Sequence, residues 1–320
     1  MKKTAIFALS AVFILSPLSA KSISEFFEDT GRAIEKTGKK IEEKSGDIIH
    51  TIKNKTTTFG EQITDAVSEL KLVSSLEFTS SKVQKLDISL TSEKLLVVPY
   101  SGDIIILESY SKSGDDYWNS GLSGNTLKVS CKKTIRKTSS SVIIYLPSEQ
   151  YLSEVVLDST SGSIKYIGLN CDELSIDNTS GSITIKDCIS KNVIVSSTSG
   201  SISTDNLACT KLKVDSTSGS VKCNNLDCKS FDIDTTSGSV NVELSYMVSK
   251  DSSIDTTSGR LTLELPDNAG FNLNVDTNSG LVTNDFEPAR KMPKNFSAKY
   301  NGGGVTIKIK TTSGSISIED

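Results

Sequence analysis

The segment Thr160-Ser161-Gly162-Ser163-Ile164 recurs almost unchanged along the second half of this 320-residue chain. The glycines of its Ser-Gly pairs are Gly162, Gly181, Gly200, Gly219, Gly238, Gly259, Gly280 and Gly314. Successive glycines are separated by 19, 19, 19, 19, 21, 21 and 34 residues. Repeats of this length are typical of solenoids, in which each repeat packs against its neighbours.

Aliphatic residues keep a fixed distance from each glycine. Two positions later stand Ile164, Ile183, Ile202, Val221, Val240, Leu261, Val282 and Ile316. Twelve and fourteen positions after the first four glycines stand Leu174 and Ile176, Val193 and Val195, Leu212 and Val214, and Phe231 and Ile233. This alternation predicts strands whose apolar residues face inward, on either side of a glycine turn. We therefore expect an all-β fold, a right-handed single-stranded β-helix with coils of 19 to 21 residues.

The N-terminus predicts export. Residues 1–20 combine Lys2 and Lys3 with an apolar run and a small-residue end at Ala20, the pattern of a signal peptide. The run is shorter than the roughly 20 residues that cross a bilayer. We expect a location in the periplasm, on the outer membrane surface or outside the cell.

Residues 21–70 predict an amphipathic helical segment, because Phe27, Ile34, Ile41 and Ile48 recur every seven positions. It would serve as a stalk or a cap. A membrane-surface helix, giving peripheral membrane contact through residues 22–70, and a short coiled coil are the alternatives.

Residues 71–320 form the predicted solenoid domain, with regular repeats over 155–320. Before the repeats, strands are indicated by alternating apolar residues such as Leu86, Ile88 and Leu90. Trp118, the only tryptophan, is interpreted as a packing residue in a loop or at the rim. The segment from Asn284 to Gly304 is interpreted as a loop insertion.

The repeats resemble those of a widespread bacterial family described as "putative adhesins", which read apolar-x-apolar-x-x-x-Ser-Gly-Ser/Asp-Ile/Val. The resemblance covers about Leu86 to Asp320 and includes the strand Val142–Pro147. It implies a β-helix domain of an exported or envelope protein, without catalytic residues.

An aspartate stands four residues before most of these glycines: Asp158, Asp177, Asp215, Asp234, Asp255 and Asp276. Ser196 and Lys310 interrupt the column. We interpret the column as turn residues whose carboxylates accept backbone hydrogen bonds. A calcium ladder is the alternative, because carboxylates suit a hard cation.

The six cysteines permit disulfides in an exported chain. Cys209 and Cys228 share a column on adjacent coils, and Cys171 could meet Cys188 on its neighbouring coil. The alternative is that Cys188 and Cys223, at positions that are otherwise often aliphatic, fill the core as small apolar residues. No CxxC pair or histidine accompanies them, so we expect no metal site.

Charge and motifs disfavour several classes of function. The formal net charge of −4 argues against a nucleic-acid partner. The only histidine, His50, lies outside the repeats, and no phosphate-binding glycine motif occurs, so we expect neither catalytic residues nor a cofactor.

The sequence therefore predicts a non-enzymatic, adhesin-like binding or scaffold module. Its partner would be a glycan, a protein or another copy of the chain. One alternative is a self-assembling filament, because the strand Ser315–Asp320 would end the chain with an open edge. A carbohydrate-active enzyme is the second alternative, because β-helices also carry such enzymes.

Overall fold

A computed structural model describes residues 58–132, 139–287 and 292–320. The predicted signal peptide and the helical segment up to residue 57 lie outside these ranges. The fold is all-β, as predicted, and α4 (Thr58–Val67) is the α-helix of the described part. The chain divides into two compact units: the first reaches Tyr151 and includes Tyr166–Leu169, and the second comprises Leu152–Lys165 and Asn170–Asp320. No helix in the described ranges is long and apolar enough to cross a membrane.

The first unit is a mixed sheet. Its strands are β1 (Lys71–Thr79), β2 (Lys85–Leu90), β3 (Lys94–Tyr100), β4 (Ile104–Ser111), β5 (Trp118–Ser123), β6 (Thr126–Cys131) and β7 (Ser140–Pro147), with a 3-10 turn at Ser80–Lys82. Strands β1, β4 and β7 pair antiparallel in that order, and β3 pairs parallel with the other edge of β7. A second group joins β5 and β6 antiparallel and β2 to β6 parallel.

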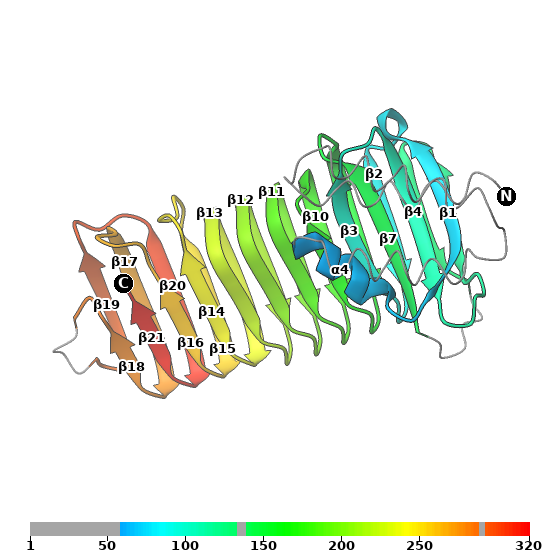
Figure 1. Ribbon diagram of the computed structural model, residues 1–320. Helices are drawn as coiled ribbons and strands as arrows, with labels where there is room; N and C mark the ends of the chain where they lie inside the picture. Colours follow the sequence, from blue (N-terminus) through cyan, green and yellow to red (C-terminus); the bar gives the residue numbers. More distant parts are fainter. Residues whose placement is uncertain (1–57, 133–138, 288–291) are drawn as a thin grey trace. The chain divides into compact units, whose positions relative to one another are not determined.

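Helix α4 covers one face of β3 and β7 (Figure 1). Ile63, Ala66 and Val67 on the helix belong to one apolar cluster with residues of these strands, including Tyr145. The Ser141 hydroxyl also donates to the Ala66 carbonyl, 2.5 Å away. The helix is thus held to the sheet by burial and by a hydrogen bond at its C-terminal end.

The second unit is a ladder of parallel strands, stacked side by side in Figure 1. They are β8 (Tyr151–Ser159), β9 (Ile164–Ile167), β10 (Asn170–Asn178), β11 (Ile183–Ser197), β12 (Ile202–Ser216), β13 (Val221–Ser237), β14 (Val240–Leu244), β15 (Ser252–Ser258), β16 (Leu261–Glu264), β17 (Phe271–Ser279), β18 (Val282–Asn284), β20 (Thr306–Ser313) and β21 (Ile316–Glu319). The first residue of β8, Tyr151, and the last two of β9, Tyr166 and Ile167, belong to the first unit. Ile183 pairs with Ile202, and Ile202 with Val221, so neighbouring strands are offset by 19 residues. This is a β-solenoid-like arrangement.

Each long strand bends around three sides of its coil. In β11 the buried positions are 183 and 185, then 188 and 190, then 193, 195 and 197, so the alternation shifts twice. The predicted aliphatic columns occupy the first and third sides and are buried. The short middle side, with Cys188 and Ser190 pointing inward, has no counterpart in the predicted pattern.

The C-terminal repeat does not end the ladder. Strand β20 pairs with β15 on one side and with β17 on the other, and β21 lies between β16 and β18 in the same way. The last strands, red in Figure 1, are therefore inserted between two coils that precede them in sequence. The prediction of an open edge at Ser315–Asp320 is wrong, because both edges of β21 are hydrogen-bonded.

The segment from Asn284 to Gly304 is not only a loop. It contains β19 (Asn295–Tyr300), which pairs antiparallel with the remaining edge of β17. Tyr300 packs with Phe271 and Phe286, with ring centroids 5.0 to 5.4 Å apart. Aromatic rings thus cover the apolar interior next to β17, where the aliphatic columns end.

Candidate functional site

An open groove follows the turn side of the second unit. It encloses about 480 Å³ and crosses the strands from β10 to β15. Its lining combines carboxylates with hydroxyls: Asp177, Ser196, Ser197, Thr198, Asp215, Ser216, Thr217, Asp234, Thr235, Thr236, Asp255 and Thr257. We name this site the Asp-Thr groove. It combines a hollow with periodic polar groups.

Register sets the spacing of the acidic row in the groove. Asp177 pairs with Ser196, Ser196 with Asp215, Asp215 with Asp234, and Asp234 with Asp255. Neighbouring strands lie about 4.8 Å apart, so the carboxylates repeat at that step wherever Asp is present. The threonines of the Thr-Ser-Gly turns form a second, exposed row beside them. A ligand would therefore meet periodic acceptors next to periodic hydroxyls.

The groove is electrostatically uneven. Partial burial raises the pKa of Asp234, and the like charges of Asp232, Asp215 and Asp255 raise it further, while Lys213 opposes them. Lys213 also pairs with Asp215, with the ammonium nitrogen 2.8 Å from Oδ2. The acidic character is consequently concentrated around Asp234, because Asp255 on its other side has the Lys310 ammonium 3.7 Å from Oδ2.

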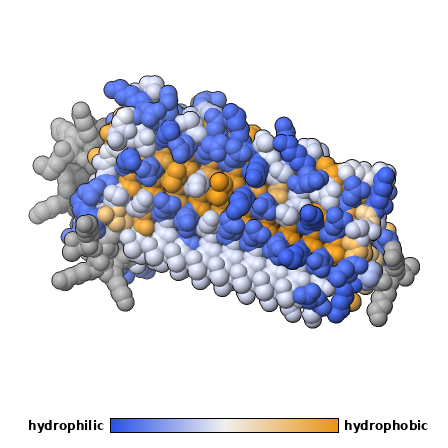
Figure 2. Space-filling view, turned by 180° about the vertical axis from the view of Figure 1, so that it is seen from behind, coloured by the Kyte–Doolittle hydropathy of each residue, from blue (hydrophilic) through white to orange (hydrophobic). Residues whose placement is uncertain are grey.

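At the turns of Gly181 and Gly219 the capping acceptor is not Asp177 or Asp215, contrary to the prediction. The Gly200 and Gly219 amides donate instead to the hydroxyls of Ser197 and Ser216, at 2.9 and 3.2 Å, and the Gly181 amide donates to Asn178 Oδ1 at 3.1 Å. This capping residue stands three positions before the glycine, one after the aspartate. The side chain of the capping residue points inward and that of the aspartate points outward. The aspartates are therefore available to line the groove. Figure 2 shows a band of residues of intermediate hydropathy along one margin of the face drawn, as expected for Thr, Ser and Gly columns.

Sequence reasoning missed two further polar ladders. Asp187, Asn206 and Asn225, six residues after their glycines, adopt positive φ angles of 50 to 53°. Asn206 Nδ2 donates to Asp187 Oδ1 at 2.7 Å, and Asn225 donates to Asn206. Asn and Asp tolerate the left-handed conformation, so the shared spacing was a usable signal.

The second missed ladder is acidic. Glu243, Glu264 and Glu319 stand five residues after their glycines and lie opposite one another. Partial burial, and then the charges of both neighbours, raise the pKa of Glu264. These glutamates lie outside the residues that line the Asp-Thr groove.

A calcium ladder requires several carboxylates that converge on one cation. No group of three or more His, Cys, Asp or Glu residues in the described ranges is arranged to hold a metal ion. In the strand ladder Lys310 lies opposite Asp255 on one side and opposite Asp276 on the other. Its ammonium nitrogen lies 3.7 Å from Asp255 Oδ2. A cation thus already stands within the acidic row. Asp158, in β8, lies outside the groove lining.

The cysteines are all thiols in the structure. Cys209 lies directly opposite Cys228 in the ladder, as the predicted pairing requires. Cys171 instead lies opposite Ser190 and Cys188 opposite Leu207, so the pair Cys171–Cys188 is out of register by two residues. The register supports the first predicted pairing and not the second.

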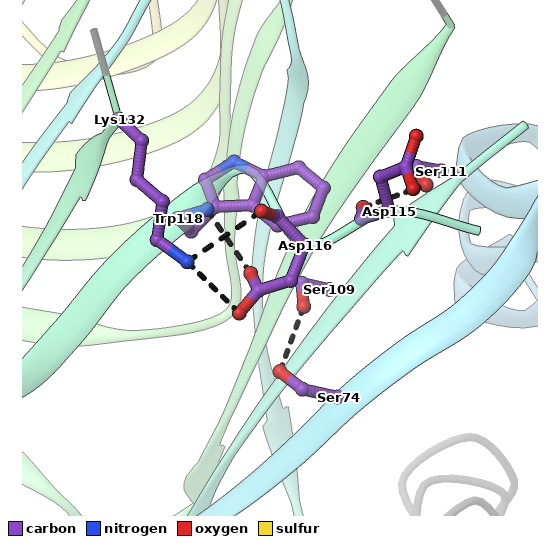
Figure 3. A network of polar contacts seen from close by, with 7 residues as sticks. All are labelled: Ser74, Ser109, Ser111, Asp115, Asp116, Trp118 and Lys132. Atoms are coloured by element: carbon purple, nitrogen blue, oxygen red, sulfur yellow. Dashed lines mark hydrogen bonds and ion pairs between the residues drawn. The ribbon is translucent and has the colours of Figure 1, made fainter. Parts of the chain in front are cut away.

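Trp118 is a strand residue and offers no ligand platform. It begins β5, is 4% exposed and packs edge-on against Tyr117. In Figure 3 its backbone amide donates to Asp116 Oδ1 at 3.1 Å, and Lys132 pairs with Asp116 Oδ2 at 3.2 Å. Its role is packing, as predicted, although not in a loop.

The family model described as Toastrack DUF4097 matches residues 83–319. This chain belongs to the Toastrack DUF4097 family. The matched range contains the whole Asp-Thr groove and begins after α4 and β1. None of the curated proteins matches this Toastrack chain.

Several solved structures resemble this Toastrack chain at low identity. A putative adhesin from Bacteroides fragilis shares 12% identity with a TM-score of 0.49, covering 78% of this chain and 97% of its own. A putative adhesin from Parabacteroides merdae shares 15% identity with a TM-score of 0.43 and the same coverage. A putative cell adhesion protein from Clostridium sporogenes shares 13% identity with a TM-score of 0.24, covering 78% and 99%.

Proposed function

We propose that this Toastrack protein is an exported, non-enzymatic, adhesin-like module of the cell envelope that binds its partner in the Asp-Thr groove. In this proposal the solenoid is a right-handed β-helix with 19- to 21-residue coils, delivered by the signal peptide of residues 1–20. The partner is a glycan, since hydroxyl groups donate to carboxylates and also exchange hydrogen bonds with threonine side chains.

The lining of the Asp-Thr groove is the observation that supports glycan binding. The groove is a hollow of about 480 Å³ lined by four aspartates and four exposed threonines. Charge-assisted hydrogen bonds to carboxylates are stronger than neutral ones, and a repeated row lets a linear polymer bind through several units at once. Because the row follows the strand ladder, its repeat is fixed by the backbone.

The proposed chemistry is binding without turnover. Paired carboxylates in glycoside hydrolases differ in environment, so that one acts as the acid and one as the base or nucleophile. In the groove the aspartates form a single row, in which the raised pKa of Asp234 has partial burial as its first cause and its carboxylate neighbours as the next. The chain's only histidine, His50, lies outside the family match.

A glycan array probed with the purified full chain tests the proposal. We expect binding to a limited set of polysaccharides and a loss of at least tenfold in affinity for the double variant Asp215→Asn and Asp234→Asn. The matched control is Glu243→Gln with Glu264→Gln, which removes the same charge from an acidic ladder outside the groove lining. Equal loss in both double variants would show a general charge effect and overturn the groove assignment.

Export is tested separately. Protease treatment of intact cells should cleave a surface-exposed protein, and osmotic release should recover a periplasmic one. Recovery of the chain with residues 1–20 intact in the cytoplasmic fraction would contradict the proposed export.

A further inference from the structure

Cys209 and Cys228 lie directly opposite each other in the parallel ladder of β12 and β13. The register is regular on both sides, with Ala208 opposite Asp227 and Lys211 opposite Ser230. Neighbouring strands are about 4.8 Å apart, within the Cα separation of about 4.4 to 6.8 Å that disulfides span. Backbone movement is therefore not needed to bring the two residues within bridging range.

The two thiols differ in their access to solvent. Cys228 is 4% exposed, whereas Cys209 is half-buried. A hydrogen bond with Cys209, and then burial, raise the pKa of Cys228 above its ordinary value. A reagent from solvent consequently reaches the Cys209 sulfur first, with Cys228 beside it. The buried Cys223 is near enough for its charge to affect Cys228, and it is the competing thiol.

We propose that Cys209 and Cys228 are a modification site at which a disulfide-bearing oxidant staples two adjacent coils together. The Cys209 thiolate attacks one sulfur of the oxidant, forming a mixed disulfide and releasing the first oxidant thiol. Cys228 then loses its proton and attacks the Cys209 sulfur, releasing the second. One S–S bond breaks and one forms, and two protons pass from the protein thiols to the oxidant's sulfurs.

The staple closes a short loop of 18 intervening residues between positions 209 and 228. Cross-linking a loop of this size removes conformational freedom from the unfolded chain. It would join β12 and β13, which both contribute to the Asp-Thr groove, and would hold Asp215 opposite Asp234. In the cell the reaction rests on the proposed export, because a reducing cytoplasm keeps thiols reduced.

Oxidation of the purified, reduced full chain tests the geometry. After treatment with oxidised glutathione and alkylation, mass spectrometry should count four thiols instead of six and find one cross-linked peptide pair containing Cys209 and Cys228. The melting temperature should rise by about 5 to 10 °C on oxidation.

One variant tests the assignment and a second is the control. Cys209→Ser places at this position the residue that the preceding coil carries, the buried Ser190, so the variant should fold and lose both the cross-link and the temperature shift. Cys131→Ser, in the first unit, should retain both. Six alkylatable thiols after oxidation of the folded chain, or a cross-link through Cys223, would overturn the proposal. Glycan binding and cell fractionation do not enter this experiment, so its outcome is separate from that of the proposed function.

Discussion

A Cβ atom on Gly219 would lie 1.7 Å from the carbonyl oxygen of Gly200 on the neighbouring coil. The same clash recurs along the column, at 1.8 to 2.3 Å for Gly238, Gly259, Gly280 and Gly314 with their own neighbours. These contacts are with backbone, which cannot rotate away. The repeated glycine is therefore required by the close stacking of turns.

Replacing Gly219 by Ala should destabilise the second unit by about 3 kcal/mol, because the two coils must move apart to admit the methyl group. Thermal and denaturant unfolding measure the effect. Gly121→Ala is the control, since its Cβ meets nothing within 4 Å, and it should change stability little. Similar losses in both variants would contradict the stacking explanation.

Substitution of Asn206 should lower stability through its backbone conformation. Its φ of 53° is disfavoured for most side chains. Its side-chain amide donates a hydrogen bond to Asp187 and accepts one from Asn225. We expect Asn206→Ala to cost about 2 kcal/mol and Asn206→Gly about 1 kcal/mol, because glycine accepts the conformation and loses only the hydrogen bonds. Denaturant unfolding of the two variants measures the difference. A smaller loss for alanine than for glycine would show that the backbone conformation is not the constraint.

Glu108 should make the first unit less stable as the pH rises. It is fully buried between β1 and β7, where it accepts a hydrogen bond from Tyr110 at 2.6 Å. Burial raises its pKa from 4.5 to about 7, although hydrogen bonds from Tyr110 and Tyr145 oppose the shift. Below pH 4.5 both folded and unfolded chains are protonated. Between pH 4.5 and 7 only the folded chain keeps the proton, so stability falls by about 3 kcal/mol across that range and then levels off.

Glu108→Gln should remove this pH dependence and raise stability at pH 8 relative to the natural chain. Denaturant titrations at pH 5, 6, 7 and 8 measure the slope. Glu77→Gln, at an exposed position of β1, should leave the slope unchanged. An unaltered slope in Glu108→Gln would assign the pH dependence to another group.

Deleting residues 306–320 should release more of the chain than the deleted strands. Strand β17 pairs with β20 and β19, and β18 pairs with β21. Without β20 and β21, residues 271–300 lose their contact with the rest of the ladder, so trypsin should cut rapidly at Lys294 and Lys299. Removing only Asp320, which lies outside β21, should leave both sites as slow as in the full chain. Unchanged protection after the longer deletion would mean that β17 can pair with β15 directly.

Much of the second unit followed from spacing in the sequence. The positions two after each glycine, and twelve and fourteen after the first four, are buried, and the aspartates face outward, because neighbouring repeats pair in phase and place like residues side by side. The paired column of Cys209 and Cys228 followed for the same reason. The predicted Cys171–Cys188 pair did not, since it disregarded register.

The sequence by itself determined the repeat, its inward columns and the need for glycine at each turn, because these depend on contacts between identical neighbours. Only the tertiary structure decided that β20 and β21 lie between earlier coils, since either edge of a parallel ladder offers the same backbone hydrogen bonds. It also decided that Lys310 stands between Asp255 and Asp276. The Asp-Thr groove depends on both. The spacing in the sequence predicts its rows of aspartates and threonines, and the tertiary structure places these rows along a common hollow.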